Sequence, residues 1–260
     1  MLDFLLKNNL LNNSQHGFLP SRSCCSALLS FMNYATNSVD NNKPVDVVYL
    51  DFTKAFDSVP HDHLIAKLTH IGFRGVVLNL IKSFLTDRQQ KVNIAESCSQ
   101  YISVPSGVPQ GSVLGPLLFL IYIDDIDTGI SSNIIKFADD IKLFSSLNRA
   151  DHSSFDGTDN LFDWPLQRDL DLISDWCNSW LLKLNPDKCS CLHIGRSNPH
   201  IKYNIKDSLI PPSDSVVDLG VVLTKDLKPS THCLNPLKTC LLYTSPSPRD
   251  LSTSRMPSSA

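Results

Sequence analysis

Two short apolar runs on either side of an acidic pair place the strongest constraint on this fold. Residues 134–138 and 141–144 are rich in Ile and Phe, and Asp139 and Asp140 separate them. Runs of this length and composition are typical of strands, and Asp is favoured in turns. The segment therefore predicts a β-hairpin with both carboxylates pointing outward at its tip.

A third carboxylate follows another strand-like run. Residues 45–50 are mainly β-branched or aromatic, over a length that suits a buried strand, and Asp51 stands directly after them. A charge at a strand end can reach a cleft rather than the core. For each element alone a simpler interpretation stays open: Asp51 as a strand terminator, and Asp139 with Asp140 as a solvated acidic turn.

Three carboxylates held together make chemical sense when metal ions are present. Neighbouring carboxylates repel one another and raise each other's pKa, and bound cations relieve that repulsion. Two Mg²⁺ ions roughly 3.5–4 Å apart can activate a hydroxyl, neutralise phosphates and stabilise the leaving oxygen in one displacement. Hard oxygen ligands favour Mg²⁺ or Mn²⁺ over Zn²⁺. The pattern therefore indicates a two-metal site for nucleotidyl transfer.

Other motifs accompany these acidic residues in a fixed order along the chain. They are QHGFLPSRSC at 15–24, LDFTKAFDSVPH at 50–61, GVPQGSVLGP at 107–116, FADD at 137–140, LNPDK at 184–188 and DLGV at 218–221. In residue type and order they resemble the palm of reverse transcriptases, and the chain is most similar to the polymerases of jockey-like non-LTR retrotransposons. The resemblance extends from about residue 2 to about residue 227.

The resemblance implies an α+β fold: a right-hand polymerase palm with partial fingers, in which helices back an antiparallel sheet. It divides the chain into partial fingers at 1–44, the palm at 45–227 and the start of a thumb connection at 228–239. Within the palm we expect a fingers insertion at about 62–105 and an exposed polar loop at about 145–165.

The resemblance also implies roles for individual residues. It places around two Mg²⁺ or Mn²⁺ ions the side chains of Asp51, Asp139 and Asp140 and the backbone carbonyl of Phe52. It places Phe56 beneath the sugar, Gln110 and Gly111 near the nucleotide and template, Lys188 near the triphosphate as a proton donor, and Leu219 and Gly220 at the primer grip. The implied partners are an RNA template, a DNA primer and deoxynucleoside triphosphates.

RNA-directed DNA polymerisation for retrotransposon copying is the activity that the resemblance implies. Two alternatives stay open: a non-catalytic remnant of a mobile element, and a two-metal phosphohydrolase, which would give no role to Phe56 or to the loop at 107–111. Phosphoryl transfer needs positioning and charge neutralisation more than a covalent protein group, so the lack of an obvious Ser/His or Cys/His nucleophile is no objection. By family, we expect the protein inside the cell, in the cytoplasm and nucleus.

Composition sets broader limits on the chain. Its 260 residues, 42% of them hydrophobic and 19% charged, can bury a sizeable core. The longest apolar run, at 113–123, is too short to cross a bilayer, and the chain does not open with the basic segment of a secretory signal. Eight cysteines at irregular spacings indicate reduced thiols. The net charge of -3 argues mildly against nucleic-acid binding, unless the acidic residues gather at the metal site.

Hydrophobic periodicity predicts the remaining elements. Helices are expected at 2–11, 26–39, 61–70, 75–85, 114–126 and 166–184, and a strand pair at 90–94 and 99–104. The aromatic stripe of the last helix, with Trp176 and Trp180, is expected in the core rather than as a stacking platform. Cys189, Cys191 and His193 could form a metal cluster, but their alternation with other residues favours a strand.

The two ends of the chain carry separate expectations. Residues 240–260 resemble a translated sequencing adapter, and their Ser, Thr and Pro content without apolar periodicity predicts a disordered tail. The start at Met1 resembles a truncation, with further fingers elements expected upstream. On these expectations the chain as written shows weak or no processive synthesis, because parts that hold primer and triphosphate are missing.

Overall fold

The computed structural model describes residues 1–95, 97–147 and 165–233. Its helices are α1 (Leu2–Lys7), α2 (Cys24–Asp40), α3 (Ala55–Ser58), α4 (His61–His70), α5 (Gly75–Leu85), α6 (Leu114–Ile123), the 3₁₀ helix η1 (Asp124–Asp127) and α7 (Pro165–Ser179). Its strands are β1 (Val45–Leu50), β2 (Gln89–Gln90), β3 (Asn93–Ile94), β4 (Ser97–Cys98), β5 (Ile102–Ser103), β6 (Asn133–Phe137), β7 (Asp140–Ser146), β8 (Ser190–Ile194), β9 (Asn204–Ile205), β10 (Ser208–Leu209), β11 (Pro212–Ser213), β12 (Ser215–Asp218) and β13 (Val221–Thr224). Most of the predicted loop at 145–165, half of the segment at 228–239 and the whole predicted tail at 240–260 lie outside the described residues.

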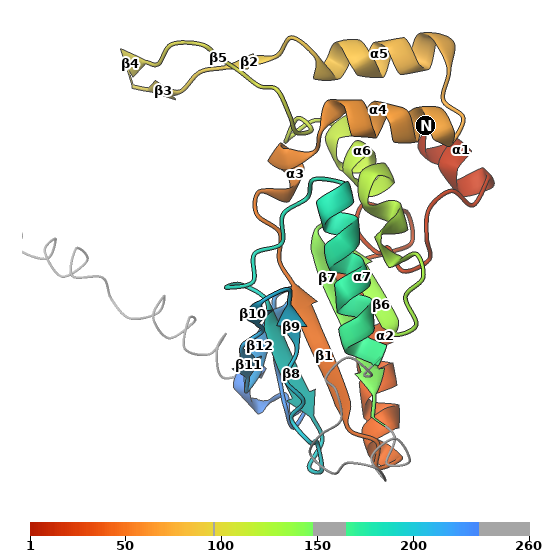
Figure 1. The fold of residues 1–260 in the computed structure, drawn as a ribbon, viewed down its shortest axis with the longest axis vertical. Helices are drawn as coiled ribbons and strands as arrows, with labels where there is room; N and C mark the ends of the chain where they lie inside the picture. The colour runs from red at the N-terminus through yellow and green to blue at the C-terminus, as the bar shows by residue number, and fades with distance from the viewer. Residues whose placement is uncertain (96, 148–164, 234–260) are drawn as a thin grey trace, which may run out of the picture.

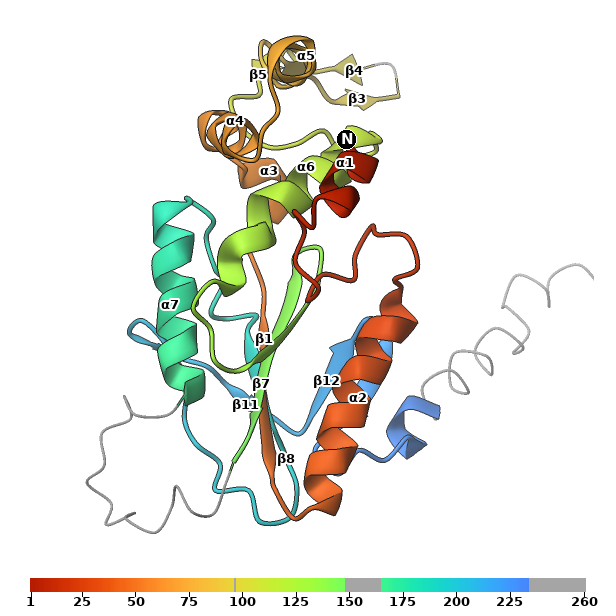
Figure 2. The same ribbon diagram turned by 90° about the vertical axis from the view of Figure 1, so that its right-hand side faces the viewer.

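A five-stranded sheet forms the centre of the molecule (Figure 1). The strand order is β11-β8-β1-β7-β6, and the pairings are antiparallel except that of β11 with β8. Helices α2 and α7 lie on opposite sides of this sheet (Figure 2). The predicted α+β class, with an antiparallel sheet backed by helices, is therefore confirmed.

Strand β1 is buried on both faces, which explains its apolar sequence. Side chains alternate across a strand, so Val45 and Val47 pack with residues of α2, while Val48 and Leu50 pack in the cluster that contains α6 and α7. All four side chains are almost fully buried. A strand covered in this way meets solvent at its ends, and Asp51 directly follows the last covered residue.

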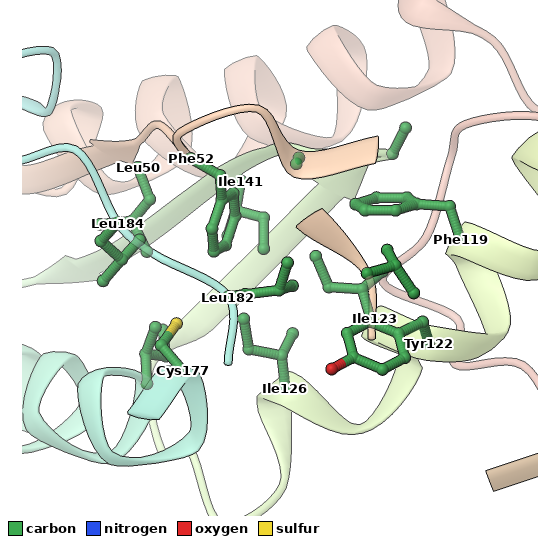
Figure 3. Packing of buried hydrophobic residues seen from close by; sticks show 14 of the residues in the cluster. Leu50, Phe52, Phe119, Tyr122, Ile123, Ile126, Ile141, Cys177, Leu182 and Leu184 are labelled. Atoms are coloured by element: carbon green, nitrogen blue, oxygen red, sulfur yellow. The ribbon is translucent and has the colours of Figure 1, made fainter. Parts of the chain in front are cut away.

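The core beneath the strand ends joins the sheet to the helices (Figure 3). Leu50 of β1 and Ile141 of β7 share one buried cluster with Tyr122 of α6 and with Leu182 and Leu184, which follow α7. Each Å² of apolar surface removed from water contributes roughly 25 cal/mol to stability. Packing on this cluster therefore holds the ends of β1 and β7 at fixed positions.

Helices α4 and α5 lie at one end of the molecule, and a long hairpin projects from them away from the sheet (Figure 1). The predicted strands at 90–94 and 99–104 are shorter than expected. The hairpin pairs only in two places, β2 with β5 and β3 with β4, and all these strand residues are exposed. Because neither face of the hairpin is buried, packing adds little to extend the ladders.

Two predicted helices end earlier than their apolar patterns indicate. The expected helix at 2–11 stops at Lys7, because Asn9 adopts a left-handed φ of 51° and the Leu10 amide donates to the Leu5 carbonyl. The expected helix at 166–184 stops at Ser179 in the same way. There Leu181 has a φ of 56°, and the Leu182 amide donates to the Cys177 carbonyl. Both ends are Schellman motifs, in which one left-handed residue ends the helix.

The other helices agree more closely with their predictions. Helix α2 begins at Cys24, where Ser23 and Ser26 form a capping box, and α4 and α5 have the predicted bounds of 61–70 and 75–85. The expected helix at 114–126 is divided, because α6 ends at Ile123 and η1 continues as 3₁₀ helix. The strand predicted around Cys191 and His193 is confirmed as β8.

Candidate active site

Strands β6 and β7 form the predicted hairpin, but its turn differs by one residue from the prediction. Phe137 pairs with Asp140 in the ladder, so the two turn residues are Ala138 and Asp139. Ala138 has a φ of 57°, in the left-handed region that Ala rarely adopts. The prediction of an Asp-Asp turn is wrong, because Asp140 is the first residue of β7 and Ala138 belongs to the turn rather than to the first strand.

The end of β1 places Asp51 against the loop that follows α7. The backbone carbonyl of Asp51 accepts a hydrogen bond from the Asn185 amide at 2.9 Å, and its amide donates to the Cys189 sulfur at 3.4 Å. Lys188 Nζ lies 3.8 Å from Asp51 Oδ2. This Oδ2 atom is buried, and no donor among the described residues hydrogen-bonds to it. A buried carboxylate oxygen without a donor is unfavourable, so the atom is a candidate cation ligand.

The pKa values of Asp139 and Asp140 reflect burial and the carboxylates around them. Burial raises the pKa of Asp139, and the nearby Asp51 carboxylate raises it further. Burial of the carboxyl group, followed by the charges of Asp139, Asp218 and Asp51, raises the pKa of Asp140 to about 6, although the residue keeps contact with solvent. The carboxylates therefore lie close enough to repel one another.

These carboxylates do not converge on a single point. In the part of the chain that the structure describes, no three His, Cys, Asp or Glu side chains form a group that could hold a metal ion. Asp51 and Asp140 line a cavity of about 170 Å³ together with Lys188 and Leu219. Asp139 is not part of that lining. The structure thus places two of the three carboxylates in one cavity, with the third in the adjoining turn.

In the metal-free protein, Asp140→Asn should raise the thermal midpoint by about 2–4 °C near neutral pH. The folded-state pKa of about 6 lies above the ordinary value of 3.8, so ionised Asp140 destabilises the fold above pH 6. As the pH falls through 6 towards 3.8, the folded wild type binds the proton first and regains this stability. The advantage of the variant should therefore disappear below pH 3.8. Thermal denaturation of wild type and variant across this pH range tests the prediction. A variant less stable than wild type near neutral pH would contradict it.

The Gly-Val-Pro-Gln-Gly loop packs against α3. Gln110 Nε2 donates to Asp57 Oδ1 at 2.9 Å, next to Phe56 on the same short helix. Gly107 has a φ of 86°, and a Cβ at this position would lie 2.6 Å from the Asp57 carbonyl oxygen. Only glycine permits this close approach. The structure therefore brings Gln110 and Phe56 together through α3, while Gly111 is exposed.

The hairpin of β12 and β13 carries the residues predicted for the primer grip. Its turn residues, Leu219 with a φ of 47° and Gly220 with a φ of 85°, both have positive φ, as in a type I′ turn. Asp218 precedes the turn and forms a buried ion pair with Lys142 of β7; Tyr49 of β1 donates to the same carboxylate. This anchor was not predicted from the sequence; the signal that could have indicated it is a lysine within an apolar strand.

Most of the chain matches a known protein family. Residues 1–223 match the family described as "Reverse transcriptase (RNA-dependent DNA polymerase)". The chain belongs to the reverse transcriptase family. Members of this family use divalent metal ions. The acidic residues at the end of β1 and in the β6–β7 hairpin offer the carboxylate oxygens that such ions prefer as ligands.

Two curated relatives from Drosophila melanogaster resemble this chain. They are "Probable RNA-directed DNA polymerase from transposon BS", 27% identical over 92% of this chain, and "RNA-directed DNA polymerase from mobile element jockey", 28% identical over 85% of it. The chain spans only 26% and 24% of the lengths of these two relatives. The predicted similarity to jockey-like non-LTR elements is confirmed.

A solved structure shares the fold of this chain. It is the apo telomerase from Candida tropicalis, truncated from its C-terminal domain, with a TM-score of 0.57 and 12% identity. The match covers 88% of this chain and 43% of the telomerase chain. At this identity the likeness concerns the fold alone, and it supports the polymerase palm.

None of the helices among the described residues combines the length and apolar character needed to cross a membrane.

If Phe56 lies beneath the sugar as the resemblance implies, Phe56→Val should raise ribonucleotide incorporation relative to deoxyribonucleotide incorporation by at least about tenfold. Phe56 is partly buried and stacks on Phe119 with ring centroids 4.2 Å apart, which fixes the ring. A ring where the 2′ position lands would clash with a ribose and pack on a deoxyribose. The ratio of kcat/KM values for the two nucleotides measures the effect.

Phe84→Val is the control for Phe56→Val, because Phe84 also packs at the core margin, on α5. This control should leave the nucleotide ratio unchanged. If Phe56→Val instead lowers activity equally with both nucleotides and also lowers the thermal midpoint, the ring serves packing only.

Proposed function

We propose that this chain catalyses RNA-templated DNA synthesis by nucleotidyl transfer to a primer 3′-hydroxyl. The observation that carries the proposal is the buried Oδ2 of Asp51 at the end of β1, which accepts no hydrogen bond from the described residues and lies beside the hairpin that bears Asp139 and Asp140. Family membership supports the reaction class. An RNA template, a DNA primer and deoxynucleoside triphosphates are the proposed substrates, in the copying of a retrotransposon.

The donor atoms at this site suit hard divalent cations. Asp51, Asp139 and Asp140 offer carboxylate oxygens, and Asp51 Oδ2 lacks a donor among the described residues. The raised pKa values of Asp139 and Asp140 arise partly from repulsion that cations would relieve. These three side chains and the carbonyl of Phe52 would hold two Mg²⁺ or Mn²⁺ ions, which supply charge neutralisation for phosphoryl transfer when bound.

The remaining predicted residues bind and orient the reactants. Lys188 is exposed and lies 3.8 Å from Asp51 Oδ2, so its ammonium group can give a proton to the departing pyrophosphate. The ion pair with Asp51 also keeps the Lys188 ammonium beside the cavity before substrate binds. Other proposed contacts are Phe56 with the sugar, Gln110 and Gly111 with the nucleotide and template, and Leu219 and Gly220 with the primer end.

A non-catalytic remnant is the second candidate, and one observation favours it. The three carboxylates do not form a ready metal group in the described chain, so a bound cation would have to draw them closer. The phosphohydrolase alternative loses its support, because the family match runs through the loop at 107–111, to which a phosphohydrolase gives no role. An assay of nucleotide addition distinguishes an active polymerase from a non-catalytic remnant.

The test is addition of a single deoxynucleotide to a DNA primer annealed to an RNA template. The purified chain should add the nucleotide complementary to the next template base, only with Mg²⁺ or Mn²⁺ present. Single-turnover conditions, with protein in excess over primer, remove the need for processive synthesis. Absence of addition at protein concentrations that saturate the primer–template would support the remnant, and addition that ignores the template base would contradict RNA-templated synthesis.

A further inference from the structure

The segment before the first long helix forms an extra edge on the central sheet. The Lys136 amide of β6 donates to the Ser14 carbonyl at 2.8 Å, and the His16 amide donates to the Lys136 carbonyl at 2.7 Å. Gln15 therefore stands beside Lys136 in a parallel bridge. A residue at the start of the chain thereby lies next to the strand that leads into the turn with Asp139.

The Gln15 side chain reaches past this bridge to the turn itself. Only 1% of Gln15 is exposed, and its Oε1 accepts hydrogen bonds from the Ala138 amide at 3.0 Å and the Gly17 amide at 2.7 Å. Ala138 is itself buried and has the left-handed φ of 57°. Without Oε1, the buried Ala138 amide would lose its acceptor in a turn whose backbone is already unfavourable for Ala.

Gly17 shows how closely the segment approaches the turn. A Cβ at Gly17 would lie 2.6 Å from the Ala138 nitrogen and 3.1 Å from Gln15 Oε1. A contact of 2.6 Å with backbone has no flexible partner that could move aside. Glycine at this position therefore permits Gln15 to stay within hydrogen-bonding distance of Ala138.

We propose that Gln15 is a positioning residue, which holds the Ala138 backbone so that the next residue, Asp139, keeps the orientation needed for catalysis. The acceptor oxygen Oε1 makes the contact with the turn, whereas Gln15 Nε2 has no partner among the described residues. An uncharged acceptor suits this place, since a further carboxylate would add to the repulsion around Asp139. The link to Asp139 rests on the proposed function, whereas the effect on the turn does not.

Amide-resolved hydrogen exchange of the Ala138 backbone tests the first half of the proposal. In Gln15→Met, which keeps the length and removes the acceptor, Ala138 exchange should become about tenfold faster or more. Gln167→Met is the matched control: Gln167 is also buried, and its Oε1 accepts the Asn204 amide at 2.9 Å in another part of the palm. The control should leave Ala138 exchange unchanged.

Binding of Mn²⁺ tests the second half. Mn²⁺ affinity should fall about tenfold in Gln15→Met, because Asp139 loses its fixed orientation, and should stay at the wild-type value in Gln167→Met. Unchanged exchange at Ala138 overturns the positioning role. Faster exchange with unchanged Mn²⁺ affinity overturns the link to Asp139. If wild type itself binds no Mn²⁺, the proposed metal site fails, and the exchange result still decides whether Gln15 holds the turn.

A conservative variant keeps the test decisive if Gln15→Met does not fold. Gln15→Glu retains an acceptor oxygen at the same reach, and at acidic pH its buried carboxyl group is protonated and adds no charge beside Asp139. Under that condition Ala138 exchange should stay close to the rate of wild type at the same pH. Loss of protection at Ala138 in a folded Gln15→Glu protein at that pH would overturn the proposal, because the acceptor would be present without effect.

Discussion

Asp51→Asn and Asp139→Asn should each reduce single-nucleotide addition by on the order of a thousandfold. Asn keeps the size and shape of Asp and removes the negative charge, so the loss reports on cation binding rather than on packing. For Asp51 the argument is strongest, since its Oδ2 is buried without a donor among the described residues. Single-turnover rates over a series of Mg²⁺ concentrations measure the loss.

The stability of these variants separates a chemical defect from a folding defect. Asp62→Asn is the control, because Asp62 is an exposed carboxylate on α4, and it should retain full activity. Asp139→Asn should be at least as stable as wild type, since burial and the Asp51 carboxylate raise the pKa of Asp139. Substantial synthesis by a folded Asp139→Asn protein would remove Asp139 from the proposed metal site.

Substitutions of these acidic residues would then change stability and activity in opposite directions. The carboxylates at the end of β1 and in the β6–β7 hairpin repel one another in the absence of cations, which raises the pKa of Asp139 and Asp140. Removing a charge relieves that repulsion and also removes a proposed ligand. Residues of this kind are expected to gain stability and lose function on the same substitution.

Local sequence patterns were enough to predict the elements that deliver the carboxylates. The runs that form β1, β6 and β7 are recognisable because a short run of apolar, often β-branched residues is a property of neighbouring residues. The motif order then predicted the family. The bounds of α4 and α5 were also predictable, because an apolar helical period ends there at Gly72 and Thr86.

Features that depend on distant residues could not be predicted in this way. The turn was misplaced because the left-handed φ of Ala138 is supported by Gln15, 123 positions earlier. The early end of α7 depends on Leu181 in a left-handed conformation, which leucine seldom adopts. The anchor of the β12–β13 hairpin joins Lys142 to Asp218, 76 positions later. In each case the tertiary structure stabilises a contact or a backbone conformation that the local sequence does not favour.

Asp218→Asn should destabilise the fold by about 3 kcal/mol, because it leaves the charge of Lys142 without its partner. Lys142 and Asp218 are only 4% and 7% exposed, so water cannot take the place of the carboxylate. Burial already lowers the pKa of Lys142, and the Asp218 charge opposes that shift. Urea denaturation measures the change in the free energy of unfolding. Asp214→Asn is the control, directly before β12: its pair with Lys225 is exposed, and its loss should have a negligible effect.

The double variant Lys142→Met with Asp218→Leu distinguishes the pair from simple packing. Replacing a buried ion pair by apolar residues is often neutral or stabilising, so the double variant should recover most of the stability that Asp218→Asn loses. Its primer affinity should nevertheless fall, because Tyr49 would also lose its hydrogen bond to Asp218, and β12 would no longer be tied to β1 and β7. A double variant with wild-type stability and wild-type primer affinity would show that the ion pair has no part in positioning the proposed primer grip. An Asp218→Asn protein as stable as the Asp214→Asn control would show that it does not anchor the hairpin at all.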